Sequence, residues 1–578
     1  MPPETPLEDF WKAFADSCDA LSGRVVGDPF MGGATSLVEA SRLGADVTGV
    51  DVDPLAVRTA RVELRRLDVS AFTAEAKAML ADLRDELSHL YPSGDGEPLH
   101  YFRLREACCG DCGHRALVHR NLWLVRDRGL SGAVVREEGG VAFCPLCREL
   151  HRIDSDRKVL ECCGRRHRLD AGTYSRARFE CPQCRSPASN EELRVGLLPS
   201  RLIAVEETVD SGYRTLRKPA KADLQAVELM ESSSDENQAL EVALGAVDSG
   251  RPASYGYQTV ADLFHPRQKK VLSAAFAWID ERDSTSSVKD ALRLAVSNAL
   301  GSNNVLCGYA TDYGRLSSLF SGVRAYSVPV LSVELNPLHR SAGRGTLAAT
   351  LRRVARSGDP TVTRHTISPV DGRPVRHTFQ AHGDGRRAIR CSSADRPLPQ
   401  DLGSYDLVLT DPPYFDFIPY SDLSLIYRAW QTPESEAERL GGTPIFPVGD
   451  DPAAEFASRL SRAFRNVGEA LKPEAPMIFT FHSPHREAWD AVEVALKGAD
   501  FRVHSAFPVW ADGRGGSHGH AGNCEWDLVF VCRQGVDVAD PVEVTAEEWA
   551  SNLEDQSVEP VDLRNIALGL GMASRLGS

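Results

Sequence analysis

Short apolar runs that end in acidic or polar residues recur at the start of the chain and in its last third. Apolar runs of this length, bounded by turn residues, are typical of strands buried on both faces of a sheet. Between the first two runs lies a segment with helical spacing, so the start of the chain predicts a β-α-β unit. The expected strands lie at residues 25–28, 46–53, 388–395, 406–410, 477–482, 501–510 and 526–532.

The run at 406–410 leads into Asp-Pro-Pro-Tyr at 411–414, called here the Asp411 loop. Its two prolines make the loop rigid, because each ring fixes its own φ. The Asp411 carboxylate and the Pro412 carbonyl can together accept both hydrogens of a planar exocyclic amine, and the Tyr414 ring can stack on a base. With Pro413, these are the candidate catalytic residues. The alternative is a simple turn after a buried strand.

A glycine-rich turn at residues 28–35, called here the glycine turn, follows the first expected strand. Glycines let the backbone approach a ligand closely, and the helix that follows presents free N–H groups at its start. Asp51 ends the next strand, where Rossmann-like folds place a carboxylate that binds ribose hydroxyls. The pattern predicts a nucleoside cofactor, with Asp51 and the following turn residues as candidates: Asp28, Pro29, Phe30, Gly32, Gly33 and Thr35.

Nine of the 14 cysteines fall in four close groups between Cys108 and Cys184. Cys-x-x-Cys pairs can aim two thiolates at one tetrahedral ion, and enough ligands are present to close two structural zinc sites. The expected first set is Cys109, Cys112, Cys144 and Cys147. The expected second set is Cys163, His167, Cys181 and Cys184. Cys108 or Cys162 can replace its neighbour in these sets.

The net charge of −15 argues against a surface that binds nucleic acid throughout, because phosphate contact needs positive potential. Residues 101–200 differ, with 18 Lys or Arg against 13 Asp or Glu, a balance of +5. Contact with nucleic acid is therefore expected in the cysteine-rich segment. The chain shows neither an apolar run of transmembrane length nor a signal-type segment, so we expect a soluble, cytoplasmic protein.

The glycine turn resembles methyltransferase motif I, usually written D-P-F-x-G-x-G-T, with Ala34 in place of the last glycine. Asp51 occupies the position of the motif II acid. Asp395 resembles the acid of motif III, which meets the adenine of the cofactor. The Asp411 loop resembles motif IV of the amino-methyltransferases, which methylate adenine N6 or cytosine N4 in DNA from S-adenosylmethionine.

The order of these motifs, with the cysteine-rich insertion and residues 263–268 and 334–337 between them, is similar to a family of large bacterial DNA methylases with zinc-ribbon insertions. The resemblance covers residues 25–535. It implies an α/β, Rossmann-like S-adenosylmethionine-dependent methyltransferase fold that is discontinuous. The implied parts are a cofactor half at 1–70, a zinc ribbon at 71–200, a mostly helical target-recognition insertion at 201–384, a catalytic half at 385–535 and an acidic tail at 536–578.

The expected activity is methylation of an exocyclic amine in DNA, at adenine N6 or cytosine N4, in restriction-modification or phage defence. RNA is the alternative substrate, because related loops methylate RNA on the same fold. A second alternative is a zinc-containing DNA-recognition subunit with little activity of its own. Family members carry a further amino-terminal block ahead of motif I, so a protein partner that supplies this block is also expected.

Overall fold

The chain folds as two compact units, each built from segments that are far apart in the sequence. Unit 1 comprises residues 1–67, 358–421 and 439–578, and unit 2 comprises residues 68–357 and 422–438. Unit 1 thus contains both the glycine turn and the Asp411 loop. The computed structural model describes residues 20–126, 140–154, 156–209, 213–231, 240–244, 247–320, 326–340, 343–358, 361–367, 374–380, 383–415, 420–431, 445, 451–510, 524–535 and 559–577.

Unit 1 is built around a seven-stranded sheet with the order β20-β2-β1-β21-β22-β24-β23. The first five strands in this order run parallel, whereas β24 runs antiparallel to both of its neighbours. Strands form where the apolar runs predicted them, and the unit is a mixed α/β structure. Their bounds are β1 (Val25–Asp28), β2 (Asp46–Asp51), β20 (Arg387–Cys391), β21 (Leu407–Thr410), β22 (Met477–Phe481), β23 (Phe501–Trp510) and β24 (Trp526–Gln534), with a separate hairpin of β18 (Thr361–Ile367) and β19 (Pro374–Gln380).

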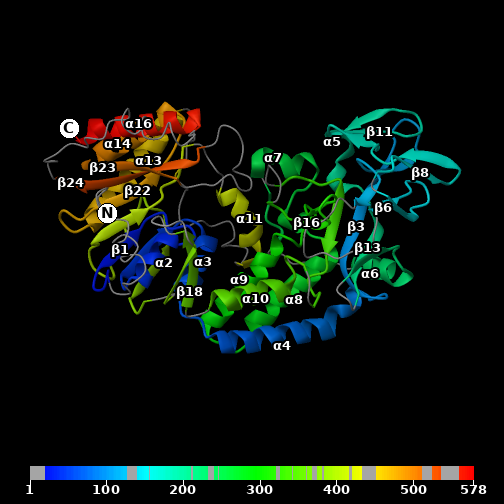
Figure 1. Cartoon of the computed structure of the whole chain (residues 1–578), viewed down its shortest axis with the longest axis horizontal. Helices are drawn as coiled ribbons and strands as arrows, with labels where there is room; N and C mark the ends of the chain where they lie inside the picture. Colours follow the sequence, from blue (N-terminus) through cyan, green and yellow to red (C-terminus); the bar gives the residue numbers. More distant parts are fainter. Residues whose placement is uncertain are drawn as a thin grey trace. The chain divides into compact units, whose positions relative to one another are not determined.

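Helices cover both faces of this sheet. Neighbouring residues of a strand point to opposite faces, so adjacent residues of β1 pack in different clusters. Val26 packs in a cluster with Leu37 of α2 and Val57 of α3, whereas Val25 packs in a second cluster with Phe456 of α13 and Trp489 of α14. In Figure 1 the blue β1 and the orange β23 belong to this one sheet, although they come from opposite ends of the chain. The helices are α2 (Thr35–Arg42), α3 (Pro54–Glu63), α13 (Pro452–Ala470) and α14 (Arg486–Gly498).

A further helix, α16 (Pro560–Gly577), belongs to the core of unit 1. It packs against β23, β24 and α14, with Leu570 and Met572 buried. Asp562 is 1% exposed and accepts hydrogen bonds from two backbone N–H groups at the start of β24. Residues 560–577 of the predicted acidic tail are therefore part of the folded unit, because their apolar face covers the end of the sheet.

The chain leaves β1 and β21 toward opposite sides of the sheet, since β2 lies on one side of this pair and β22 on the other. The two strands pair in parallel, through Val26 with Leu407 and Gly27 with Val408. Ligands of open α/β sheets bind outside the carboxyl ends of the strands at such a switch point. The glycine turn and the Asp411 loop therefore begin where a ligand is expected.

Unit 2 contains a sheet that joins the two insertions predicted from the sequence. Strand β3 pairs with β4 in the cysteine-rich segment and also with β13 and β17 from the following segment. The predicted boundary at residue 200 thus falls inside one sheet, because Ser200 is the first residue of β13. The bounds are β3 (Glu97–Cys108), β4 (Arg115–Val118), β13 (Ser200–Thr208), β14 (Arg214–Arg217) and β17 (Leu331–Leu335), with a separate hairpin of β15 (Gly308–Ala310) and β16 (Arg315–Ser317).

Helices α4, α8, α9 and α10 pack on one another beside this sheet in unit 2. No helix in the described part of the chain is both long and apolar enough to cross a membrane. The helices of the unit are α4 (Val69–Leu87), α5 (Asn190–Leu193), α6 (Lys221–Glu231), α7 (Val247–Ser254), α8 (Pro266–Glu281), α9 (Ser286–Leu300), α10 (Leu347–Ser357) and α11 (Tyr420–Gln431), whose first two residues belong to unit 1.

The two sequence motifs at 263–268 and 334–337 meet in a buried ion pair. Nε of Arg267 lies 2.8 Å from Oε1 of Glu334, and Nε of Arg103 lies 2.8 Å from Oε2. Burial alone would raise the pKa of Glu334, but the charges of the two arginines outweigh it and hold that pKa well below its usual range. The motifs therefore have a structural role, since they place a compensated charge at the centre of unit 2.

We predict that Glu334→Gln destabilises unit 2 by about 3–5 kcal/mol, because both arginines then lose their buried counter-charge. Native-state hydrogen exchange of the β3 and β17 amides measures this loss directly. The matched control is Glu180→Gln, which breaks the exposed pair of Glu180 with Arg185 and should cost less than about 1 kcal/mol. Equal protection in the two variants would contradict a stabilising role for the buried pair.

Candidate functional site

Asp28, the last residue of β1, is buried and joins three parts of the site. Its carboxylate accepts hydrogen bonds from the N–H of Phe30 (3.0 Å), from Oγ of Ser36 in α2 (2.9 Å) and from Oγ1 of Thr410 at the end of β21 (2.6 Å). Burial raises the pKa of Asp28 to about 6, although these three hydrogen bonds act to lower it. Asp28 therefore holds the glycine turn, α2 and β21 together.

Asp51, the last residue of β2, holds the tip of the glycine turn. Its carboxylate accepts hydrogen bonds from the N–H groups of Gly32 (3.0 Å) and Asp53 (2.8 Å). Burial raises the pKa of Asp51 to about 6 against the effect of these bonds. The predicted cofactor residue thus lies beside the turn, at the carboxyl end of the strand next to β1.

Ala34 stands where the motif that the glycine turn resembles has glycine, and it takes the left-handed conformation, with φ of 64°. A residue with a side chain is strained there by roughly 1–2 kcal/mol. The methyl group of Ala34 is fully buried in the cluster formed with α2 and α3. It therefore points into the core and does not narrow the space over the turn.

The space over the glycine turn is open at Gly32 and Gly33. A Cβ atom added to either residue would meet no atom within 4 Å, whereas one added to Gly27 or Gly49 would lie 2.6 Å from a neighbouring side chain. Packing thus explains the glycines at 27 and 49 but not Gly33, whose φ is not positive. An open backbone of this kind suits close approach of a ligand.

The helix that follows the turn adds a positive end to this open backbone. Helix α2 starts at Thr35 with no side-chain cap and no acidic residue in its first turn. Backbone N–H groups at such a helix start attract anions. Of the remaining predicted residues, Pro29 is buried, Phe30 packs half-buried against the cluster with α13, and Thr35 is exposed. The turn and helix start fit a nucleoside that carries a carboxylate.

Asp411 follows β21 and is held by two hydroxyl groups. Oη of Tyr414 and Oγ1 of Thr480, on the neighbouring β22, each donate a hydrogen bond of 2.7 Å to Oδ1 of Asp411. The residue is exposed to solvent, yet the atoms packed around its carboxylate partly desolvate it and raise its pKa. Pro412 is buried and Pro413 half-buried. The loop therefore presents an oriented carboxylate at the surface.

Tyr414 packs against a histidine that the sequence analysis did not select. The centre of its ring lies 4.3 Å from that of His482, and the ring meets Phe481 edge-on at 5.4 Å. His482 directly follows β22, and its Nδ1 lies 2.6 Å from Oδ1 of Asp527 in β24. The sequence signal that could have selected His482 is its position as a polar residue directly after an apolar strand. Its partner Asp527 could not be found, because only strand pairing brings the two together.

Helix α16 fixes the same corner of unit 1 through the fully buried Asn565. Oδ1 of Asn565 accepts a hydrogen bond of 2.9 Å from the N–H of Ser483, next to His482. Its Nδ2 donates one of 2.8 Å to the carbonyl of Trp526, next to Asp527. One side chain from the predicted tail thus bridges the neighbours of both members of the pair.

Asp395, predicted to meet the cofactor adenine, forms ion pairs with α13. Its Oδ2 lies 2.9 Å from Nη2 of Arg459 and 3.8 Å from Nη2 of Arg462. Burial acts to raise the pKa of Asp395, but the hydrogen bonds and the charge of Arg459 act against burial, and that pKa is lowered. The charge of Asp395 is therefore compensated within unit 1, and its contact with adenine stays a prediction.

Unit 1 thus brings the two main predicted clusters to one edge of its sheet. The hydrogen bond from Thr410 to Asp28 joins the start of the Asp411 loop to the start of the glycine turn. Phe30 and Tyr414, one from each segment, pack against the same hydrophobic cluster. The glycine turn and the Asp411 loop therefore lie side by side at the switch point.

Eight cysteines form two groups in unit 2, and within each group all sulfur atoms lie within 4.8 Å of one another. A tetrahedral zinc ion with four thiolates places the sulfur atoms about 3.8 Å apart. Each group can therefore hold a metal ion such as zinc. The first group is Cys109, Cys112, Cys181 and Cys184, and the second is Cys144, Cys147, Cys162 and Cys163.

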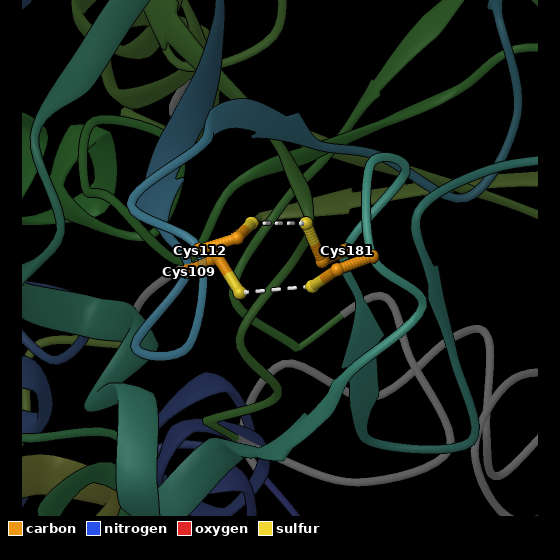
Figure 2. A group of neighbouring side chains, drawn as sticks. Cys109, Cys112 and Cys181 are labelled. Carbon is orange, nitrogen blue, oxygen red and sulfur yellow. Dashed lines mark hydrogen bonds between the residues drawn. The ribbon is translucent and has the colours of Figure 1, made fainter.

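The first group is formed by two loops that face each other. Sγ of Cys109 lies 3.6 Å from Sγ of Cys184, and Sγ of Cys112 lies 3.6 Å from Sγ of Cys181. Figure 2 shows Cys109 and Cys112 projecting from one loop toward Cys181 on the other. Because all four sulfur atoms converge between the loops, one ion would close the group.

The second group has a fifth neighbour. Sγ of Cys147 lies 3.5 Å from Sγ of Cys162, and Sγ of Cys144 lies 4.0 Å from Sγ of Cys163. Nε2 of His167 also lies 4.0 Å from Sγ of Cys144. The predicted ligand His167 is thus beside this group, but Cys162 completes the set of four thiols.

The predicted division of the cysteines into sets was wrong. The pair Cys109 and Cys112 meets the last pair of the segment, and the two middle pairs meet each other. Backbone hydrogen bonds outside the regular strands explain this order. The N–H of Tyr174 bonds to the carbonyl of His119, which brings β11 (Arg178–Glu180) and β12 (Pro187–Ser189) to β4. Leu122 bonds to both Leu169 and Phe143, which brings the hairpin of β8 (Val159–Cys162) and β9 (Arg165–Arg168) to β6 (Gly140–Phe143).

Each Cys-x-x-Cys pair occupies the turn between two paired or adjacent strands. In all three, the residue after the second cysteine has φ of 64–70° and donates its N–H to the carbonyl of the first cysteine: Gly113, Arg148 and Arg185. Cys163 instead lies with Gly164 in the two-residue turn of the β8–β9 hairpin, both with positive φ. The strands are β5 (Trp123–Val125), β6 (Gly140–Phe143), β7 (Leu150–Ile153), β8 (Val159–Cys162), β9 (Arg165–Arg168), β10 (Tyr174–Ser175), β11 (Arg178–Glu180) and β12 (Pro187–Ser189).

Two of these thiols are biased toward the thiolate, which is the form that binds metal. The hydroxyl and N–H of Ser186 lower the pKa of Cys184 to about 6. The N–H of Glu149 lowers the pKa of Cys147 to about 7. Each turn therefore supplies a donor to the sulfur of its second cysteine, as outer-shell groups do in metal sites.

Arginines stand exposed on the hairpins that carry the cysteines: Arg165, Arg166, Arg168, Arg176, Arg178 and Arg185. Two of them have exposed acidic partners, since Nε of Arg166 lies 3.3 Å from Oε1 of Glu161 and Nη1 of Arg185 lies 2.8 Å from Oε1 of Glu180. Such surface pairs are weak and leave the guanidinium groups accessible to phosphate.

No protein-family model matches the chain, and no curated protein matches its sequence. A role for the protein must therefore be argued from the two sites themselves. The first is the pair of loops at the switch point of unit 1. The second is the pair of cysteine groups in unit 2.

We predict that the purified chain holds two zinc ions and that paired substitutions reveal which cysteines share an ion. Cys112→Ser with Cys184→Ser should leave one ion, because both cysteines belong to the first group. Cys112→Ser with Cys147→Ser should leave none, because it breaks both groups, and His167→Ala should keep two. Metal analysis of each variant provides the test. The reverse outcome for the two double variants would contradict the observed grouping.

Proposed function

We propose that this chain is an S-adenosylmethionine-dependent methyltransferase that modifies an exocyclic amine in DNA. The proposal is carried by the junction of the glycine turn and the Asp411 loop, where Thr410 donates a hydrogen bond to Asp28. Methyl transfer requires that donor and acceptor be held in contact and in line. The β23–β24 pair supports the same proposal, because it suits the end of a methyltransferase sheet.

The cofactor would bind across the glycine turn. S-adenosylmethionine supplies a methyl group on a positively charged sulfur. The open backbone at Gly32 and Gly33, with the uncapped start of α2, suits the carboxylate end of this molecule. Asp51 lies at the end of the next strand, where its carboxylate would accept hydrogen bonds from the ribose hydroxyls while it holds Gly32 in place.

The target amine would bind at the Asp411 loop. Tyr414 and Thr480 fix the orientation of the Asp411 carboxylate through Oδ1. That carboxylate and the Pro412 carbonyl would accept the two amine hydrogens and direct the nitrogen lone pair at the methyl group. Desolvation raises the pKa of Asp411, so its carboxylate is a better acceptor for the proton that the methylated nitrogen must lose.

Tyr414 would hold a base that has swung out of the duplex. Its hydroxyl is bonded to Asp411 and its ring packs on His482, so the ring is fixed before any base arrives. Asp527 in turn fixes His482 through Nδ1. A preset aromatic face lowers the cost of capturing an extruded base. We assign His482 and Asp527 a positioning role for Tyr414.

A nucleic-acid substrate is favoured because the cysteine hairpins of unit 2 present exposed arginines in an otherwise acidic chain. RNA offers the same phosphates, so it serves as the comparison in each assay. An inactive recognition subunit is the other candidate, because Ala34 stands where the motif that the glycine turn resembles has its last glycine. The buried methyl group of Ala34 leaves the turn open, which favours the enzyme.

We predict that Asp411→Ala lowers the rate of methyl transfer to DNA by about 100-fold or more, because Asp411 acts on the amine mainly in the transition state. Tyr414→Phe and Thr480→Val each remove one hydrogen bond to Oδ1, so each should slow transfer by less than about tenfold. Tyr414→Ala also removes the ring and should slow transfer more than Tyr414→Phe. Transfer of labelled methyl groups from the cofactor measures all four rates.

The control for this series is Asp51→Ala, which should act on cofactor binding. The substitution removes the carboxylate that would accept hydrogen bonds from the ribose hydroxyls, so the dissociation constant of S-adenosylmethionine should rise by about tenfold or more. Calorimetry should show unchanged cofactor affinity in Asp411→Ala. Wild-type rates in Asp411→Ala would rule out the proposed role of Asp411. Absence of methyl transfer by the wild-type chain, with cofactor and DNA binding retained, would leave the recognition subunit.

We predict that the arginines of the β8–β9 hairpin contact DNA phosphates. Replacing Arg165, Arg166 and Arg168 with Gln should weaken DNA binding and reduce its salt dependence, since each lost phosphate contact lowers the slope by about 0.9. The matched control replaces three exposed arginines of unit 1 with the same loss of charge: Arg486, Arg502 and Arg564. An identical salt slope in both triple variants would show that the hairpin arginines do not touch DNA.

A further inference from the structure

We propose that unit 1 carries a second ligand site, which binds a phosphate-bearing anion of nucleotide size. The site is a surface pocket of about 450 Å³ between the end of α3 and the edge strand β20. Two arginines from α3 and the residues after it, Arg61 and Arg65, face two from β20, Arg387 and Arg390, in the pocket lining. The pocket includes no residue of the glycine turn or the Asp411 loop and lies two strands away from β1.

The lining has an excess of positive charge. Its four arginines stand against a single acidic residue, Asp401, so its formal balance is +3 in a chain whose net charge is −15. Asp401 is engaged in an ion pair with Arg390. Four guanidinium groups on one pocket repel each other unless counter-charge is supplied. An anionic ligand would supply it.

Arg387 gives a second and independent indication. Its Nη2 donates a hydrogen bond of 2.9 Å to the carbonyl of Gly383, but its Nε is buried without a hydrogen-bond partner. Buried donors in folded proteins are nearly always satisfied. Burial also lowers the pKa of Arg387, and the charges of Arg66 and Arg65 lower it further, against the opposite effect of Asp384. The surroundings of this guanidinium thus disfavour its charge, and an anionic ligand would stabilise it.

The shape and chemistry of the pocket select the class of anion. Guanidinium groups bind phosphate through paired hydrogen bonds, which favours a phosphate over a simple point charge. The volume lies within the range of small-molecule sites and exceeds the needs of a single phosphate ion. Leu64 and Leu402 provide apolar surface for a sugar or base. A free nucleotide and a nucleotide of a nucleic-acid chain share this chemistry.

Titration calorimetry with tripolyphosphate, CTP and a short DNA duplex tests the proposal. CTP lacks the adenine of the proposed cofactor, and tripolyphosphate has no amine for the Asp411 loop, so binding of both ligands reports on the pocket. The wild-type chain should bind CTP and tripolyphosphate, with affinity that falls as salt rises. Arg65→Gln with Arg387→Gln should weaken both by at least tenfold. The matched control, Arg486→Gln with Arg502→Gln, removes the same charge from exposed positions of unit 1 and should bind like wild type.

A competition experiment distinguishes a free nucleotide from the backbone of a nucleic acid as the source of the bound phosphate. Displacement of CTP by the duplex in the wild-type chain would identify a nucleic-acid backbone, and its absence would identify a free nucleotide. If the Gln variant fails to fold, Arg65→Lys with Arg387→Lys keeps the charge but loses the paired hydrogen bonds, and should still bind several-fold more weakly. Absence of CTP and tripolyphosphate binding, or equal binding by the pocket and control variants, would overturn the proposal.

Discussion

The arrangement of unit 1 depends on one buried carboxylate, that of Asp28. It accepts hydrogen bonds from the glycine turn, from α2 and from Thr410, a residue 382 positions away in the sequence. A buried carboxylate is costly unless donors surround it, and burial indeed raises the pKa of Asp28 to about 6. Asp28 therefore tolerates little displacement of its donors. The same bonds keep the glycine turn against the start of the Asp411 loop.

The residues around the Asp411 loop contact one another in series, so that each side chain is held in position by the next. Thr480 and Tyr414 orient Asp411, His482 packs on Tyr414, and Asp527 orients His482. Asn565 of helix α16 bonds to the backbone of Ser483, next to His482, and to that of Trp526, next to Asp527. Catalysis by positioning requires such support, because small displacements of reacting groups cost rate. Unit 2 contains two cysteine groups that can hold metal ions and a buried ion pair.

Local patterns in the sequence were enough to predict the seven strands of the main sheet of unit 1, the glycine turn and the Asp411 loop, because each depends on residues close together in the chain. The hairpin of β18 and β19 was not predicted, because it falls in the segment expected to be mostly helical. Long-range partners could not be predicted. Cys109 meets Cys184 and not Cys144, since loop hydrogen bonds decide which turns face each other. Asp527 and Asn565 were missed because strand pairing and helix packing give them their roles. The ion pair of Arg267 with Glu334 could not be predicted either, because Glu334 lies on β17, which the sequence did not place beside β3.

The most direct test of the account is to identify the product of methyl transfer. The purified chain is incubated with labelled S-adenosylmethionine and either duplex DNA or RNA, and the digested nucleosides are separated. The two-loop site predicts label in DNA as N6-methyladenine or N4-methylcytosine, and no label in RNA. A chain that binds both cofactor and DNA but leaves every base amine unlabelled, or that labels RNA alone, would contradict the account.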